Sequence, residues 1–154
     1  MAERSHVWMP FTHMQSAPPP LLVHRGRGAL LELDDGRELV DCISSWWVTL
    51  HGHGEPAIAQ AIAAQADELE QVIAAGFTHA PGEELAAALV RRLPGPLDRV
   101  FYSDNGSTAV EVALKVAVQH WRNRGDSGRT RFIAFSGAYH GDTFGAMSVG
   151  ARSR

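Results

Sequence analysis

The sequence predicts an α/β fold, and three consecutive segments carry that prediction. Residues 99–103 are β-branched, aromatic or apolar, which indicates a buried strand. From Thr108 onward, apolar residues recur at helical spacing, and residues 130–136 again have the composition of a strand. Together they predict a strand, helix and strand unit of the length that a parallel crossover needs.

The composition is that of a globular protein. The 154 residues are 45% hydrophobic and 20% charged, enough in principle to bury one ordinary core. No apolar run is long enough to span a membrane, and the first 20 residues lack the layout of a secretory signal. A formal charge of −3 without a basic cluster gives no electrostatic footprint for nucleic acid. We therefore expect neither membrane nor nucleic acid as a partner.

The single cysteine, Cys42, excludes an internal disulfide. Its apolar neighbours favour a small buried core residue, and a catalytic thiol is the less favoured alternative. A cytoplasmic location follows as the default for a chain without disulfides.

The beginning of the chain combines an aromatic irregular segment with a stiff connector. Trp8 and Phe11 precede three consecutive prolines at 18–20, and such aromatic side chains are expected to pack against the body or to line a cleft. Residues 31–33 and 37–40 then flank Asp-Asp-Gly, the composition of a β-hairpin. Two adjacent tryptophans follow, Trp46 and Trp47. In an extended chain their side chains would point to opposite faces.

Paired histidines, His51 and His53, alternate with glycines directly afterwards. A metal site is one interpretation, but the chain has no thiol pair and no H-E-x-x-H, so a turn before the next helix is favoured. Apolar spacing and stop signals then predict three helices, at residues 56–75, 81–92 and 107–124.

The turn before the third helix is a candidate anion site. Asp104, Asn105 and Gly106 suit a sharp reversal, and Ser107 and Thr108 would present a hydroxyl and free backbone N–H groups at the positive end of the helix dipole. The same strand, turn and helix also occur with nothing bound, and neither common nucleotide signature is present. Because ligands in parallel α/β sheets bind beyond the carboxyl ends of the strands, residues 103–108 and 137–143 should border one crevice.

Six motifs, in this order, resemble those of class-III pyridoxal-phosphate aminotransferases. Two of them, the motif at 44–47 and the motif at 139–143 with its continuation to residue 148, are specific to one subgroup, whose members aminate a long aliphatic keto-amine. The motifs are Trp-Met-Pro-Phe-Thr at 8–12, Ser-Ser-Trp-Trp at 44–47, His-Gly-His at 51–53, Thr-His-Ala-Pro at 78–81, Ser-Asp-Asn-Gly-Ser at 103–107 and Tyr-His-Gly-Asp-Thr at 139–143.

The resemblance implies a fold and an assembly. It implies the N-terminal part of the PLP-dependent transferase (aspartate aminotransferase-like) fold, with an incomplete large-domain sheet. Residues 1–54 would belong to the small domain and carry the hairpin, and residues 55–154 would begin the large domain that binds pyridoxal 5'-phosphate (PLP). Members of the family act on a keto-amine and an amino donor, and the full-length protein would be a homodimer.

The resemblance also assigns roles to individual residues. Gly106 and Ser107 would bind the cofactor phosphate, as the turn itself suggests. Tyr139 would lie over the pyridine ring and border the substrate, where a phenol offers an aromatic face and a hydrogen-bonding group. Trp46 would line the pocket for the aliphatic chain. Phe11 stands where the family often has a substrate-contacting tyrosine, and it lacks the hydroxyl.

The chemistry of the family needs a Schiff-base lysine and an acidic partner for the cofactor ring. The only lysine here, Lys115, lies eight residues beyond Ser107, roughly 12 Å along a helix at about 1.5 Å per residue. It is expected to pair with Glu111 instead. In the family both catalytic groups lie downstream of the position of Arg154. We therefore expect a catalytically inactive N-terminal fragment of a longer enzyme. Another class-III ω-aminotransferase and a non-enzymatic dimerisation or binding fragment are the alternatives.

Overall fold

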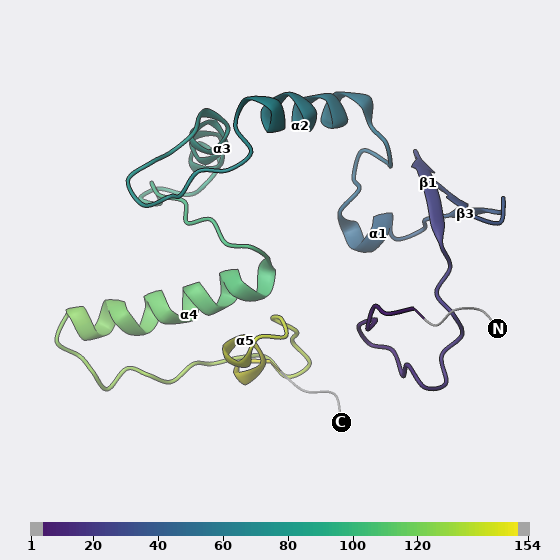
Figure 1. Cartoon of the computed structure of the whole chain (residues 1–154). Coiled ribbons are helices and arrows are strands. Elements are labelled where there is room, and N and C mark those ends of the chain that lie inside the picture. Colours follow the sequence, from purple (N-terminus) through teal and green to yellow (C-terminus); the bar gives the residue numbers. More distant parts are fainter. Residues whose placement is uncertain (1–4, 151–154) are drawn as a thin grey trace. The chain divides into compact units, whose positions relative to one another are not determined.

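The computed structural model describes residues 5–150, which divide into two compact units after Phe77. The N-terminal unit holds strands β1 to β3 and helices α1 and α2, and the C-terminal unit holds helices α3 to α5 (Figure 1).

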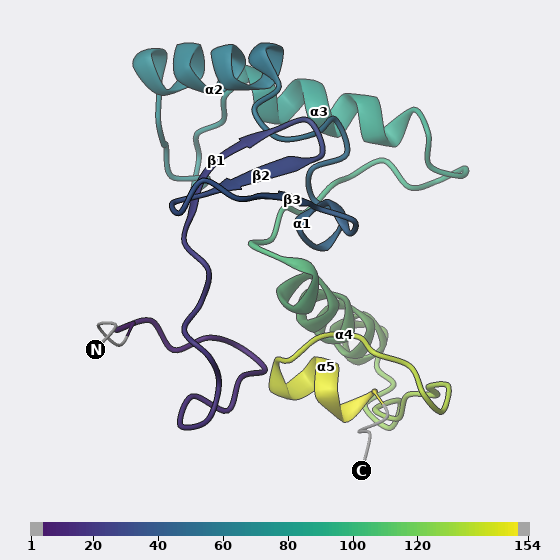
Figure 2. The same ribbon diagram turned by 90° about the vertical axis from the view of Figure 1, so that its right-hand side faces the viewer.

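A three-stranded antiparallel sheet forms the centre of the N-terminal unit (Figure 2). Its strands are β1 (Val23–Arg27), β2 (Leu30–Leu33) and β3 (Glu38–Val40), paired in that order. The register joins Leu30 to Val40, and Gly36 supplies the positive φ of +83° in the connecting turn. The predicted hairpin is therefore confirmed, whereas β1 had no prediction.

Helix α2 (Pro56–Glu68) starts as predicted but is shorter than the expected 56–75. Glu55 caps its first turn by accepting a hydrogen bond from the Ala57 amide. At the other end the backbone of Leu69 is extended, and the Gln65 side-chain amide donates to the Leu69 carbonyl. This side-chain hydrogen bond satisfies a backbone carbonyl at the helix end. The prediction was longer because the apolar residues after Leu69 continue the helical spacing.

The C-terminal unit contains α3 (Ala80–Val90), α4 (Gly106–Asn123) and α5 (Phe144–Ser148). The two longer helices match the predicted ranges to within two residues at each end. Helix α5 lies beside α4 in both views (Figures 1 and 2), and the two helices are in contact.

The two strands predicted on either side of α4 do not form. Residues 99–103 and 130–136 have no strand assignment, and within residues 5–150 the only sheet is β1-β2-β3. A strand requires a neighbour to hydrogen-bond with, and neither segment has one here. The apolar side chains of Ile133 and Phe135 consequently lie in solvent.

The expectation of one ordinary core is also wrong for the described residues. Among residues 5–150 the only buried apolar side chains are Leu33, in β2, and Ala146, in α5. Cys42 is exposed rather than buried, because it follows β3 in the turn toward α1 (Ser44–Trp47). None of the helices described is both long and apolar enough to cross a lipid bilayer.

Candidate active site

The first turn of α4 is built by local hydrogen bonds. The Asn105 side chain accepts from the Thr108 amide at 3.0 Å, and the Thr108 hydroxyl accepts from the Asn105 amide at 3.1 Å. This reciprocal capping box satisfies two backbone donors at the start of the helix. The Ser103 hydroxyl adds a 2.7 Å hydrogen bond to the Thr108 hydroxyl. Thr108 therefore serves the cap, and the ligand-facing role falls to its two predecessors.

Gly106 and Ser107 leave donors free at this helix end. Within residues 5–150 their backbone N–H groups have no hydrogen-bond partner, as expected for the first turn of a helix. A Cβ added at Gly106 would meet nothing within 4 Å, so the side of the turn that this Cβ would occupy is open. The Ser107 Oγ accepts from the Asp142 amide at 3.1 Å, which leaves the hydroxyl hydrogen available to donate. The arrangement suits a phosphate-sized anion.

The segment 137–143 lies against this turn, as the sequence predicted. Besides the bond from the Asp142 amide, the Thr143 hydroxyl donates to the Ser107 carbonyl at 3.4 Å. Gly141 has φ of +124°, and a Cβ there would lie 2.7 Å from the Ser107 Cα. Only glycine fits this close backbone approach. The predicted juxtaposition is thus present even though the flanking strands are not.

Tyr139 is exposed, but its hydroxyl is held. The phenol donates a 2.8 Å hydrogen bond to Asp142 Oδ2, and 71% of the residue surface remains accessible. Accepting that bond, the carboxylate stabilises the neutral phenol and raises the pKa of Tyr139. The ring is therefore oriented from its polar end while its faces stay open.

A contact without a sequence signal ties α5 to α4. Glu111 Oε1 accepts from the Gly145 amide at 2.8 Å, and a side chain at Gly145 would collide with the Glu111 carboxylate. This bond replaces the predicted Glu111 to Lys115 ion pair, which is absent from residues 5–150. The Glu111 carboxylate, which helical spacing had paired with Lys115, therefore binds α5 instead.

In the N-terminal unit, the tryptophan pair lies in a left-handed turn rather than an extended strand. The φ angles of Ser44, Ser45, Trp46 and Trp47 are +49°, +45°, +67° and +68°. The Trp47 amide donates to the Ile43 carbonyl at 2.8 Å. Residues other than glycine pay about 1–2 kcal/mol each for this conformation. The expectation that the two side chains point to opposite faces of a strand is therefore wrong.

The left-handed turn brings two predicted substrate residues together. The rings of Phe11 and Trp46 are stacked, with centroids 6.0 Å apart and planes inclined by 23°. Trp47 meets Trp46 edge-on, with centroids 6.1 Å apart. Phe11 and Trp46 are 79% and 61% exposed, so the pair presents an open apolar surface rather than a core contact.

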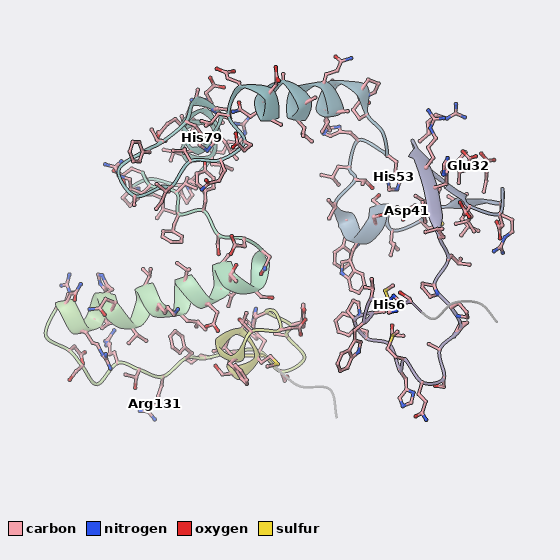
Figure 3. All side chains as sticks on the ribbon, viewed as in Figure 1. His6, Glu32, Asp41, His53, His79 and Arg131 are labelled. Carbon is pink, nitrogen blue, oxygen red and sulfur yellow. The ribbon has the colours of Figure 1, made fainter. Side chains whose placement is uncertain are left out.

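Asp41 lies beneath this turn and holds it. Its Oδ2 accepts from the Ser45 hydroxyl at 2.7 Å and is 2.8 Å from His53 Nε2 (Figure 3). Its Oδ1 accepts from the Ile43 amide at 3.3 Å. The hydrogen bonds from Ser45, with that from His53, hold the pKa of Asp41 well below its usual range. The carboxylate is therefore charged at neutral pH.

His53 is fixed from the other side by the sheet. Its backbone exchanges two hydrogen bonds with Gly28, at 2.9 and 2.8 Å. Gly52 and Gly54 flank it with positive φ, so the predicted turn is confirmed, and the ring serves as a partner of Asp41. Sequence reasoning had missed Asp41, because an acidic residue twelve positions before a histidine forms no recognisable motif.

The class-III aminotransferase profile matches residues 11–154, and the chain belongs to this family. It is 63% identical over 153 residues to an adenosylmethionine-8-amino-7-oxononanoate aminotransferase of Synechococcus elongatus, covering 99% of this chain and 36% of the relative. The enzyme of that name from Geobacter sulfurreducens is 43% identical over 150 residues, covering 96% and 33%.

Solved structures agree with this assignment. The adenosylmethionine-8-amino-7-oxononanoate aminotransferase of Methanocaldococcus jannaschii superposes with a TM-score of 0.90 at 42% identity, over 94% of this chain and 34% of that one. A PLP-bound amine transaminase from an uncultivated Pseudomonas species gives 0.85 at 35% identity, over 97% and 35%. The described fold is therefore a partial PLP-dependent transferase fold, and the chain spans about a third of the length of these relatives.

Proposed function

We propose that this chain is part of an aminotransferase that transfers an amino group to 8-amino-7-oxononanoate, giving 7,8-diaminononanoate in biotin biosynthesis. The observation that carries the proposal is the set of unpaired donors at the start of α4, on Gly106 and Ser107, in a chain with 63% identity to a relative of that name. The amino donor, S-adenosylmethionine or lysine, is left open.

The donors at the start of α4 would hold the phosphate of pyridoxal 5'-phosphate. Two backbone N–H groups and the Ser107 hydroxyl lie in the first turn of the 18-residue helix, where the helix dipole favours negative charge. When bound, the cofactor supplies the carbonyl group and the electron-withdrawing ring that amino transfer needs. The protein contributes binding and orientation.

Tyr139 would lie over the cofactor ring and border the substrate. Its hydrogen bond to Asp142 fixes the direction of the phenol while leaving the ring faces accessible. The stacked rings of Trp46 and Phe11 would contact the aliphatic chain of the keto-amine, because they form an exposed apolar surface. Phe11 would do so by its ring alone, without a hydroxyl contact.

Lys115 would take no part in the covalent chemistry. It lies eight residues after Ser107 in α4, roughly 12 Å along the helix axis. The catalytic lysine would come from a longer, cytoplasmic and homodimeric enzyme, and the 154-residue chain by itself would not transaminate. Stoichiometric borohydride trapping of the cofactor on Lys115, with turnover of 8-amino-7-oxononanoate by this chain, would contradict that assignment.

The phosphate assignment is tested by Ser107→Asp in the full-length enzyme. The carboxylate interacts favourably with the helix dipole in the cofactor-free protein, so Tm without cofactor is retained. It repels the phosphate, so the dissociation constant of pyridoxal 5'-phosphate, measured by absorbance titration, rises at least about tenfold.

The matched control is Ser127→Asp, which adds the same charge in the loop after α4, far along the helix from Ser107. Its cofactor affinity should equal that of the wild type. An equal dissociation constant for Ser107→Asp and the control would remove the phosphate from this turn.

A further inference from the structure

We propose that Asp41, anchored to the sheet by His53, is a positioning residue for substrate selection that holds Trp46 in place through Ser45. The inference rests on the proposed function, because it takes Trp46 as part of the surface that contacts the aliphatic chain. It adds residues that lie beneath that surface and do not touch the substrate.

The turn that carries Trp46 is not stable by itself. Four consecutive residues have positive φ, a conformation that L-residues adopt singly rather than in series. The backbone bonds inside the turn, from Trp47 to Ile43 and from Val48 to Ser44, are those of a single helical turn. An isolated turn of this kind would revert to a right-handed or extended form, so contacts from outside must select it.

Asp41 supplies the contact to the middle of the turn. The Ser45 hydroxyl, next to Trp46 in the chain, donates to its carboxylate at 2.7 Å, and the Ile43 amide donates to the other oxygen. The Asp41 side chain is only 6% exposed. A charged acceptor shielded from water forms strong hydrogen bonds, so Ser45 is held firmly.

His53 anchors Asp41 to the sheet. Its side chain is 16% exposed and lies 2.8 Å from Asp41 Oδ2, and its backbone pairs with Gly28 beyond the end of β1. Gly26 has no side chain at the point where a Cβ would lie 2.7 Å from the His53 Cβ, so the ring packs directly on the strand. A continuous path therefore leads from β1 through His53, Asp41 and Ser45 to Trp46.

The consequence for function is selective. The Trp46 ring is stacked on Phe11, and its orientation follows from the φ values of Ser45 and Trp46. Loosening the turn would leave the donors at the start of α4 intact, because those depend on their own capping box. Substrate affinity would fall while cofactor affinity would not.

Ser45→Ala in the full-length enzyme tests the inference, with Ser44→Ala as the matched control. The control removes a hydroxyl from the same turn, one residue earlier, and within residues 5–150 the Ser44 hydroxyl makes no hydrogen bond. For Ser45→Ala we expect the KM for 8-amino-7-oxononanoate to rise about tenfold, the size of one lost hydrogen bond to a charged group. The kcat and the cofactor dissociation constant should stay within about twofold of the control.

Two further variants separate the possible failures. Trp46→Ala should raise the same KM, and the double variant Ser45→Ala/Trp46→Ala should be no worse than Trp46→Ala alone, since Ser45 acts through that ring. If Trp46→Ala raises KM but Ser45→Ala matches Ser44→Ala, the positioning role is wrong and the proposed function stands. If Trp46→Ala leaves KM unchanged, the substrate role of Trp46 fails and the inference with it.

A general loss of stability is the remaining outcome. If Ser45→Ala lowers Tm and weakens cofactor binding as well as raising KM, Ser45 is merely structural and the inference is overturned. Should Ser45→Ala fail to fold, Asp41→Asn takes its place. That variant keeps the shape of the side chain but removes its charge. Its KM must rise by a larger factor than its cofactor dissociation constant.

Discussion

The turn at 104–108 and the turn at 44–47 each carry candidate residues of their own, and they are stabilised in opposite ways. At the start of α4, the bonds that shape the turn join Asn105 to Thr108, three residues apart, and the backbone is helical from Gly106. At 44–47, the backbone is left-handed and its outside support comes from His53, twelve residues beyond Asp41 in the chain.

The difference bears on how each turn responds to change. A turn built by a capping box needs only its own residues, so distant substitutions leave it in place. A turn held against its conformational preference depends on every contact that selects it. The turn at the start of α4 should therefore be robust, and the turn at 44–47 should be sensitive to substitutions in β1 and around His53.

Gly141→Ala should have the largest effect, because it acts on the close approach of residue 141 to Ser107 and not on the capping box that shapes the α4 turn. The new Cβ would lie 2.7 Å from the Ser107 Cα in a backbone with φ of +124°. Clash and strain together should destabilise the full-length enzyme by roughly 3 kcal/mol, measured by denaturant unfolding.

Gly137→Ala separates strain from clash at this site, since its φ is +78° and a Cβ would meet nothing within 4 Å. It should cost less than Gly141→Ala. Equal losses would show that the close approach to Ser107 contributes nothing.

Gly26→Ala should disrupt the turn at 44–47 from a distance. Its Cβ would lie 2.7 Å from the Cβ of His53, which has no room to withdraw from its pairing with Gly28. We expect a loss of about 2 kcal/mol and a changed near-ultraviolet circular dichroism from the Trp46 and Trp47 rings. Gly128→Ala, where a Cβ makes only an ordinary 3.5 Å contact, is the control and should do neither.

Asn105→Ala should have a smaller and purely local effect. Loss of the cap costs about 1 kcal/mol, visible as a lower Tm of the full-length enzyme. Asn123→Ala, at the other end of α4, removes the same side chain without touching the cap and should cost less. A change in the tryptophan circular dichroism of Asn105→Ala would contradict the independence of the two turns.

Acid should produce the smallest effect. The pKa of Asp41 is depressed in the folded protein, so its contribution to stability is complete above the ordinary carboxyl pKa of about 3.9 and is lost as pH falls below it. Between pH 5 and 3 the stability of the wild type should therefore decline slightly through this group. Asp41→Asn should lack that part of the decline, measured as the difference between the two unfolding curves across the pH range.

Some elements of the structure could be predicted from the sequence, and others could not. The hairpin, the start of α2, the extent of α4 and the donors at Gly106 and Ser107 were all predictable, because turn residues, caps and apolar spacing act between residues a few positions apart. The neighbourhood of Ser107 and residues 137–143 was predictable as well, although the reason offered, two paired parallel strands, was wrong.

Other features depended on contacts that no local pattern encodes. Residues 99–103 and 130–136 have strand composition but form no strand, because a strand exists only with a partner to pair with. Glu111 binds the Gly145 amide rather than Lys115, because packing of α5 on α4 brings that donor closer than the helical spacing does a cation. The handedness of the Trp46 turn was likewise set by Asp41 and His53. Local preference opposes a left-handed backbone, and the hydrogen bonds to a charged carboxylate that is anchored to the sheet outweigh it.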